Sequence, residues 1–162
     1  GNRKLYKTDI ITKNGFDCNW STLFVGRQFN LISAIEVTNY AVKYLENNPN
    51  VNNELILELA WEQEEVKVDH ILESIVSDKS SEDMKREYHK WLYSTMKEVY
   101  TNSTDENIFE EIENIFSIFH TPENMYDFFR KVSDAFYYPH DSQNTIKELV
   151  EEFLEDEKEL IL

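Results

Sequence analysis

Apolar residues recur along most of the chain at the spacing of one helix face. Similar stripes predict helices over residues 20–28, 54–62 and 66–77. In the segment after Ser33 the apolar positions fall at i, i+3, i+4, i+7 and i+8, which is typical of an amphipathic helix: Val37, Tyr40, Ala41, Tyr44 and Leu45. Later stripes predict helices that begin near four polar residues: Ser80, Asp105, Thr121 and Ser142. The pattern therefore predicts an all-α protein of about seven to eight helices.

The segments between these predicted helices are mostly short. Successive helices should therefore pack as antiparallel neighbours. No change in composition marks a domain boundary, and helix pairs of about 35–45 residues keep a stacked arrangement open. We expect a single helical domain over residues 1–162, built as a bundle or as a short α-α solenoid.

Polar residues mark several of the expected helix starts. Ser33 and Glu36 have the spacing of a capping box, in which the serine accepts from a backbone N–H and the glutamate reaches back. Pro49 ends that helix, because proline cannot continue the backbone ladder. Three further N-caps are predicted, at Ser80 with Asp83, at Thr121 before a first-turn Pro122, and at Ser142.

The start of the chain lacks helical periodicity. We expect residues 1–18 to form an irregular N-terminal segment, with Asp9 to Thr12 as at most a short extended piece. Asn14-Gly15 predicts a turn after it, since both residues tolerate the backbone angles that tight turns need.

Composition narrows the class of protein. Hydrophobic residues make up 41% of 162, enough for a core, and three Gly with three Pro are too few for a turn-rich β-sandwich. Cys18 is the single cysteine, which excludes an intrachain disulfide and favours a reducing, cytoplasmic location. No apolar run is long enough to span a bilayer and no leader pattern opens the chain, so no membrane association is expected.

Charge is the strongest global feature of the sequence. The formal net charge is −16, with −4 in residues 1–81 and −12 in residues 82–162. Such a field repels nucleic-acid phosphates and anionic lipids, and it attracts basic proteins. We therefore expect a basic protein partner and no nucleic acid, although solubility alone is an alternative explanation.

The sequence contains no recognisable catalytic motif. None of the four histidines, His70, His89, His120 and His140, has the Glu-x-x-His or HExxH spacing of metalloenzymes. Asp69, His70 and Glu73 share one turn and could hold a metal only with a second helix, whereas a solvated helix flank is the simpler interpretation. Asp17 disfavours a thiolate at Cys18. We expect no catalytic residue, no metal and no cofactor, hence a protein that is not an enzyme.

Two groups of carboxylates are candidates for partner binding. The first acidic set surrounds the fourth predicted helix start and consists of Glu62, Glu64, Glu65 and Asp69. The second acidic set lies after Asp105 and consists of Glu110, Glu111 and Glu113. Residues 148–159 add seven more acids against one lysine. Like charges on one helix are unfavourable by tenths of a kcal/mol, roughly, per i,i+4 pair, which a basic partner would relieve.

Tyr137 and Tyr138 precede Pro139 in the expected loop between the last two helices. A residue before proline is biased toward extended backbone, and exposed tyrosines are common anchors of protein interfaces. Both tyrosines are therefore candidate partner-binding residues, with packing within the loop as the alternative.

Several segments resemble a small, helical, Bacillus-type bacterial family of unknown function. The similar segments are Trp20 to Gly26, Leu31 to Val37, Tyr40-Ala41, Leu59-Ala60, Lys90-Trp91 and Phe119 to Met125. The resemblance spans most of the chain, although Tyr137 to Asn144 departs from the family's usual ending. Members of such families resemble the small acidic immunity proteins encoded beside secreted polymorphic toxins, which implies no catalytic residues.

These observations lead to three hypotheses of different classes. The first is an immunity protein that binds and neutralises a basic, nuclease-type toxin domain. The second is a helical scaffold or regulatory adaptor with another partner. The third is a metal-dependent enzyme built on Asp69, His70 and Glu73.

Overall fold

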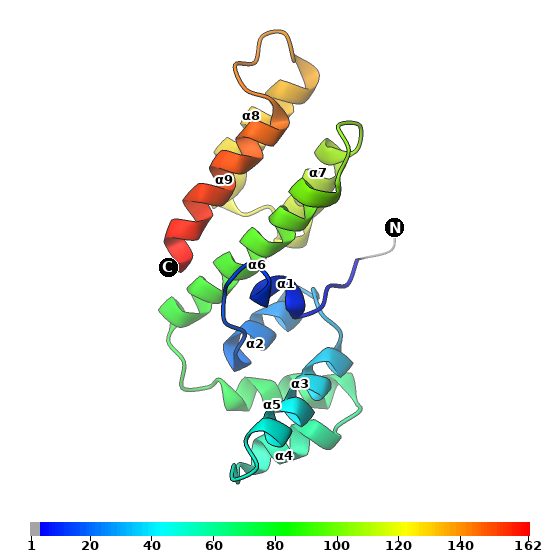
Figure 1. The fold of residues 1–162 in the computed structure, drawn as a ribbon, viewed down its shortest axis with the longest axis vertical. Coiled ribbons are helices and arrows are strands. Elements are labelled where there is room, and N and C mark those ends of the chain that lie inside the picture. The colour runs from blue at the N-terminus through cyan, green and yellow to red at the C-terminus, as the bar shows by residue number, and fades with distance from the viewer. Residues whose placement is uncertain (1–3) are drawn as a thin grey trace. The chain divides into compact units, whose positions relative to one another are not determined.

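The computed structural model describes residues 4–162, and it is helical with no strand in that range (Figure 1). Its elements, in chain order, are α1 (Asp9–Thr12), α2 (Trp20–Gln28), α3 (Ala34–Asn47), α4 (Glu54–Trp61), α5 (Glu65–Ile75), α6 (Ser81–Asn102), α7 (Ile108–Ile118), the 3-10 turn η1 (Glu123–Met125), α8 (Tyr126–Tyr137) and α9 (Ile146–Ile161). The all-α prediction is confirmed, with nine α-helices in the described part where about seven to eight were expected.

The chain divides into two compact units. The first unit extends to Tyr88 and contains α1 to α5 with the start of α6, and the second unit runs from His89 to Leu162. The boundary lies inside α6, which no change in composition marks. The prediction of a single domain over residues 1–162 stays a prediction.

Helices α3, α4 and α5 pack on one another in the first unit, and α2 packs on α5. Their inner faces carry the residues that are most deeply buried: Leu23, Val37, Ala41, Leu59, Val68 and Leu72. The Trp20 ring meets the rings of Tyr40 and Tyr44 edge-on, with centroids 4.9 and 5.2 Å apart. This cluster joins α2 to the predicted stripe of α3.

The segment around residues 9–12 is helical, so the expectation of an extended piece was wrong. Ile10 and Ile11 are both buried, which fixes one helical turn against the core. Gly15 closes this turn with φ +86°, in the left-handed region that glycine enters without strain. The adjacent Phe16 N–H donates to the Ile11 carbonyl at 3.3 Å. Residues 1–3 of the expected irregular segment lie outside the described residues.

The capping box at Ser33 is only half formed. Ser33 Oγ accepts from the Glu36 N–H at 3.4 Å, as predicted. The Glu36 carboxylate instead accepts from the Thr8 N–H at 2.9 Å, so it binds the segment before α1. A tertiary hydrogen bond has replaced the local one, which the spacing of residues within one helix could not indicate.

Helices α7, α8 and α9 form the body of the second unit, with α8 packed against both neighbours (Figure 1). Phenylalanines make these contacts: Phe116 stacks on Phe129 at 4.5 Å between α7 and α8, and Phe128 meets Phe153 at 4.4 Å between α8 and α9. The aromatic residues at core spacing therefore serve packing.

The starts of the last three helices differ from the predicted ones. Helix α7 begins at Ile108, after a turn in which the Thr104 N–H donates to Asn107 Oδ1 and the Asn107 N–H donates to Thr104 Oγ1, so Asp105 is not its cap. His120 and Thr121 have positive φ and follow the end of α7, so Thr121 is not the predicted N-cap. Pro122 has an extended backbone and precedes η1 instead of standing in the first turn of a helix. The cap of α9 is Thr145 in a full capping box with Glu148, where Ser142 was expected. The predicted pair of Ser80 and Asp83 does cap α6.

Candidate protein-binding surface

The first acidic set lies where α5 meets α2, and Arg27 of α2 binds half of it. Arg27 Nε and Nη2 donate to the two carboxylate oxygens of Asp69 at 2.8 and 3.0 Å. Nη2 also reaches Glu65 at 2.6 Å, and Nη1 donates to the Ile32 carbonyl at 2.8 Å. The hydrogen bond to Asp69 is the main reason that the pKa of Arg27 is raised, against the opposing effect of burial.

The other members of this set also have partners nearby. The Glu62 carboxylate accepts hydrogen bonds from the N–H groups of Gln63 and Glu64, at 3.0 and 3.2 Å, in the turn that leads into α5. Glu64 pairs with Lys67 at 3.3 Å on the exposed side of the helix. All four carboxylates of the first acidic set therefore have a partner within the first unit, and the two cations Arg27 and Lys67 offset half of their charge.

The second acidic set has a different environment. Glu110 and Glu111 stand in the first turn of α7, where the helix dipole favours negative charge. Glu110 and Glu113 are exposed and Glu111 is half-buried. None of the three carboxylates has an ion-pair or side-chain hydrogen-bond partner within residues 4–162. Their charge is thus available to a partner.

Exposed aromatic rings pack on α7, the helix that carries the second set. The Tyr137 ring meets Phe109 of α7 at 5.7 Å, and Phe136 stacks on Phe109 at 4.3 Å. Both Tyr137 and Tyr138 are 63% exposed, and Phe136 is 42% exposed. Tyr137 ends α8 instead of lying in the loop, so its position is fixed by the helix.

We call the area formed by Glu110, Glu113, Phe136, Tyr137 and Tyr138 the α7–α8 surface. Glu113 lies four residues after Phe109 and so on the same side of α7 as the stacked rings, whereas Glu110, the next residue in sequence, lies on the adjacent side of the helix. The fold therefore brings together two groups of predicted residues that are 24 or more positions apart. The first acidic set belongs to the other unit.

Phe136 was missed in the sequence. It lies four residues after Val132 and seven after Phe129, so it continues the apolar stripe of α8. That spacing predicts a core residue, and its partial exposure becomes apparent only once the end of α8 is seen against the start of α7.

Helix α9 presents a second row of carboxylates. Five of them, Glu151, Glu152, Glu155, Asp156 and Glu159, are exposed and lack an ion-pair partner in the described part of the chain. Glu157 turns inward and contacts His89 Nδ1 at 2.6 Å, with both side chains 6% exposed. His89 thus has a structural partner in α9.

The candidates for catalysis are dispersed. Asp69 is engaged by Arg27, and residues 4–162 contain no group of three or more His, Cys, Asp or Glu side chains placed to hold a metal ion. The Cys18 carbonyl accepts from the Tyr40 hydroxyl at 2.9 Å, and burial raises the pKa of Tyr40 to about 12. The cluster of Asp69, His70 and Glu73 therefore gains no second-helix ligand.

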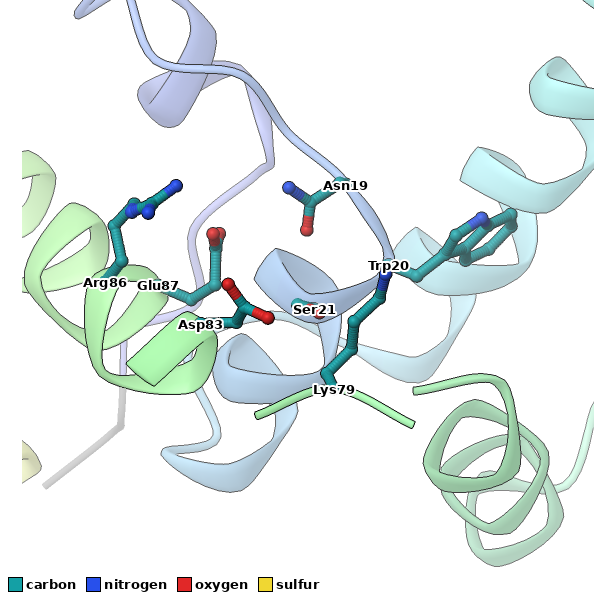
Figure 2. Close-up of a pocket in the computed structure, with 7 residues that line it drawn as sticks. All are labelled: Asn19, Trp20, Ser21, Lys79, Asp83, Arg86 and Glu87. Atoms are coloured by element: carbon teal, nitrogen blue, oxygen red, sulfur yellow. The ribbon is translucent and has the colours of Figure 1, made fainter. Parts of the chain in front are cut away.

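A small cavity of about 220 Å³ opens between the start of α2 and the first turns of α6 (Figure 2). It is lined by Asn19, Trp20, Ser21, Lys79, Asp83, Arg86 and Glu87. Sequence patterns did not indicate it, because its two walls are about 60 residues apart in the chain and no motif joins them.

A protein family described as "Uncharacterized protein conserved in bacteria (DUF2247)" matches residues 8–158. The chain belongs to this family. The matched range extends through both compact units of the chain. It confirms the expected membership of a bacterial family of unknown function, and the likeness to immunity proteins stays a prediction. No curated protein and no solved structure matches the chain.

None of the helices in residues 4–162 combines the length and the apolar content needed to cross a bilayer.

Proposed function

We propose that this protein is an immunity-type inhibitor, a cytoplasmic protein that binds a basic toxin domain of nuclease type and covers its active site. The observation that carries the proposal is the α7–α8 surface, where exposed aromatic rings pack on Phe109 of α7 and the same helix carries exposed carboxylates without cationic partners among the described residues. Tyrosine is enriched among residues that dominate binding energy, and complementary charge accelerates association.

The distribution of charge between the units supports this choice of surface. The second unit carries 6 Lys or Arg against 17 Asp or Glu, a net of −11, whereas the first unit carries 10 against 15, a net of −5. A nuclease needs a positive cleft to hold phosphates, so it would be attracted to the second unit.

The two kinds of side chain on this surface have separate roles in the proposed complex. Glu110 and Glu113 pair with lysine or arginine of the toxin and occupy positions that substrate phosphates would take. Tyr137 and Tyr138 bury their rings at the centre of the contact, which requires little loss of side-chain entropy because tyrosine has few rotatable bonds.

The test is co-expression with the product of the neighbouring gene, followed by purification at low salt and an assay of its nuclease activity. We expect a complex that suppresses the activity and weakens as salt screens the charges. Exchanging Glu110→Gln, Glu113→Gln and Tyr137→Ala together should lower the affinity by about a hundredfold.

A matched control carries the same loss of charge elsewhere in the second unit. Glu151→Gln with Glu152→Gln removes two exposed carboxylates from α9 and leaves the α7–α8 surface intact. We expect this control to change affinity by less than about threefold. The absence of any complex at low salt would remove the inhibitor proposal, and a complex without inhibition would favour the adaptor.

A further inference from the structure

The cavity in the first unit has hydrogen-bond donors without partners at its α2 end. Ser21 is only 5% exposed, lines the cavity, and its hydroxyl has no partner among the described residues. The first two N–H groups of α2 belong to Trp20 and Ser21. Of the N–H groups in this turn, the Asn19 side chain accepts only that of Thr22, so it caps neither of them. Helix N-termini with free N–H groups favour negatively charged ligand groups.

Lys79 adds a full positive charge at this end. Figure 2 shows its side chain extending toward the start of α2, and Lys79 has no ion-pair partner within residues 4–162. The Trp20 indole points away from the cavity, toward Tyr40 and Tyr44 of α3. The backbone of Trp20, and not its ring, is therefore what the cavity presents.

Carboxylates occupy the α6 side of the same cavity. Asp83 uses Oδ2 to accept the Ser80 N–H at 3.4 Å, and its Oδ1 has no partner in the described chain. Glu87, one turn further along α6, accepts a short hydrogen bond from the Thr22 hydroxyl. Figure 2 shows both carboxylates between Lys79 and Arg86.

We propose that this cavity binds a small zwitterion, with the chemistry of a free α-amino acid. The carboxylate of this ligand would accept hydrogen bonds from the Ser21 hydroxyl, the free N–H groups of α2 and the Lys79 ammonium. Its ammonium would donate to Asp83 Oδ1. Charges of both signs line the cavity, and Lys79 and Asp83 form no ion pair with each other. This site is separate from the proposed toxin-binding surface.

The size and charge of the cavity exclude the simpler ligands. A lone anion would meet the carboxylates of Asp83 and Glu87, and a lone cation would meet Lys79 and Arg86. At about 220 Å³ the cavity is smaller than usual pockets for cofactors and drug-sized ligands, which range over about 300–1,000 Å³. An amino acid carries both charges within the available volume.

The test is a titration of the full chain with glycine and L-alanine, monitored by backbone NMR shifts. Acetate and methylammonium serve as the two half-ligands. We expect saturable shifts at residues 19–21, 79 and 83 with either amino acid, and binding at least about tenfold weaker for each half-ligand, because each makes only one of the two charged contacts.

Variants locate the site and separate binding from folding. Lys79→Met and Asp83→Asn should each weaken glycine binding by about tenfold, whereas Lys85→Met and Glu82→Gln, in the first turns of α6 and outside the cavity, should leave it within about twofold. Ser21→Ala is the mildest probe of the α2 end and should weaken binding by a smaller factor. Acetate binding as tightly as glycine, no shifts with either amino acid, or equal losses in the control variants would each overturn the proposal.

Discussion

The two acidic sets look alike in the sequence and differ in the folded protein. In the first set, Asp69 and Glu65 bind the guanidinium of Arg27, whose side chain is only 8% exposed. In the second set, Glu110 and Glu113 have no ion-pair partner among the described residues, and exposed rings pack on Phe109 of the same helix. A run of carboxylates therefore indicates a binding surface only when the fold provides no internal partner.

This difference has an energetic basis. The Arg27 guanidinium donates four hydrogen bonds, two to Asp69, one to Glu65 and one to the Ile32 carbonyl, so removing Arg27 leaves all three acceptor groups without this donor. Exposed carboxylates without partners contribute little to stability and are free to change. We therefore expect mutations in the first acidic set to lower the stability of the fold, and mutations in the second acidic set to weaken partner binding.

The largest effect should come from Arg27→Met. The change leaves Asp69, Glu65 and the Ile32 carbonyl without their shared donor, and it should lower the free energy of unfolding by about 2–3 kcal/mol. Arg130→Met is the control, because Arg130 pairs with Asp127 on an exposed face of α8, with 63% of its side chain accessible. Urea unfolding followed by circular dichroism measures both variants, and the control should lose less than about 0.5 kcal/mol. Equal losses would contradict the assignment of a structural role to the first set.

A smaller effect separates the two sets directly. Asp69→Asn replaces one of the two oxygens that Arg27 binds, and should lower the free energy of unfolding by about 1–2 kcal/mol. Glu113→Gln removes a charge with no internal partner and should change stability by less than about 0.5 kcal/mol. The same urea experiment compares them. If Glu113→Gln destabilises as much as Asp69→Asn, the second set has a structural partner and the proposed surface is not free.

The smallest effect extends the comparison to a buried and an exposed tyrosine. Tyr40→Phe removes the hydrogen bond to the Cys18 carbonyl and should lower the free energy of unfolding by about 0.5–1 kcal/mol at neutral pH. Since burial raises the pKa of Tyr40 to about 12 from its usual 10, its contribution is complete below pH 10 and is lost as the pH rises through 12.

The stability gap between the native protein and Tyr40→Phe should therefore close over that alkaline range. Tyr137→Phe serves as the control, because the Tyr137 ring is 63% exposed. Urea midpoints at several alkaline pH values give the comparison. A gap that stays constant above pH 10 would show that Tyr40 ionises equally in the folded and unfolded chains.

The helices were predictable because helix periodicity is a local property. The stripe from Val37 to Leu45 and the caps at Ser33 and Ser80 were correctly assigned, since each depends on residues within two turns of one another. Predicted starts at Asp105 and Ser142 were wrong by two or three residues, because the turn of Thr104 and Asn107 precedes α7 and Thr145 forms the cap of α9.

The candidate surface could be predicted only in part. Glu110, Glu113 and Tyr137 were named from composition and position, but their proximity depends on the packing of α7 against α8. Phe136 was missed because its spacing is that of a core residue. The cavity beside Ser21 could not be predicted at all, since no local pattern links α2 to α6.

The sequence by itself determined where most of the helices lie, which faces are apolar, and that the protein is strongly acidic with most of the excess in its second half. The tertiary structure alone decided which carboxylates keep their charge for a partner and which rings stay exposed. The physical reason is the sequence separation of the interacting residues. Helix periodicity depends on residues a few positions apart, whereas Arg27 binds acids that lie 38 and 42 positions further along the chain.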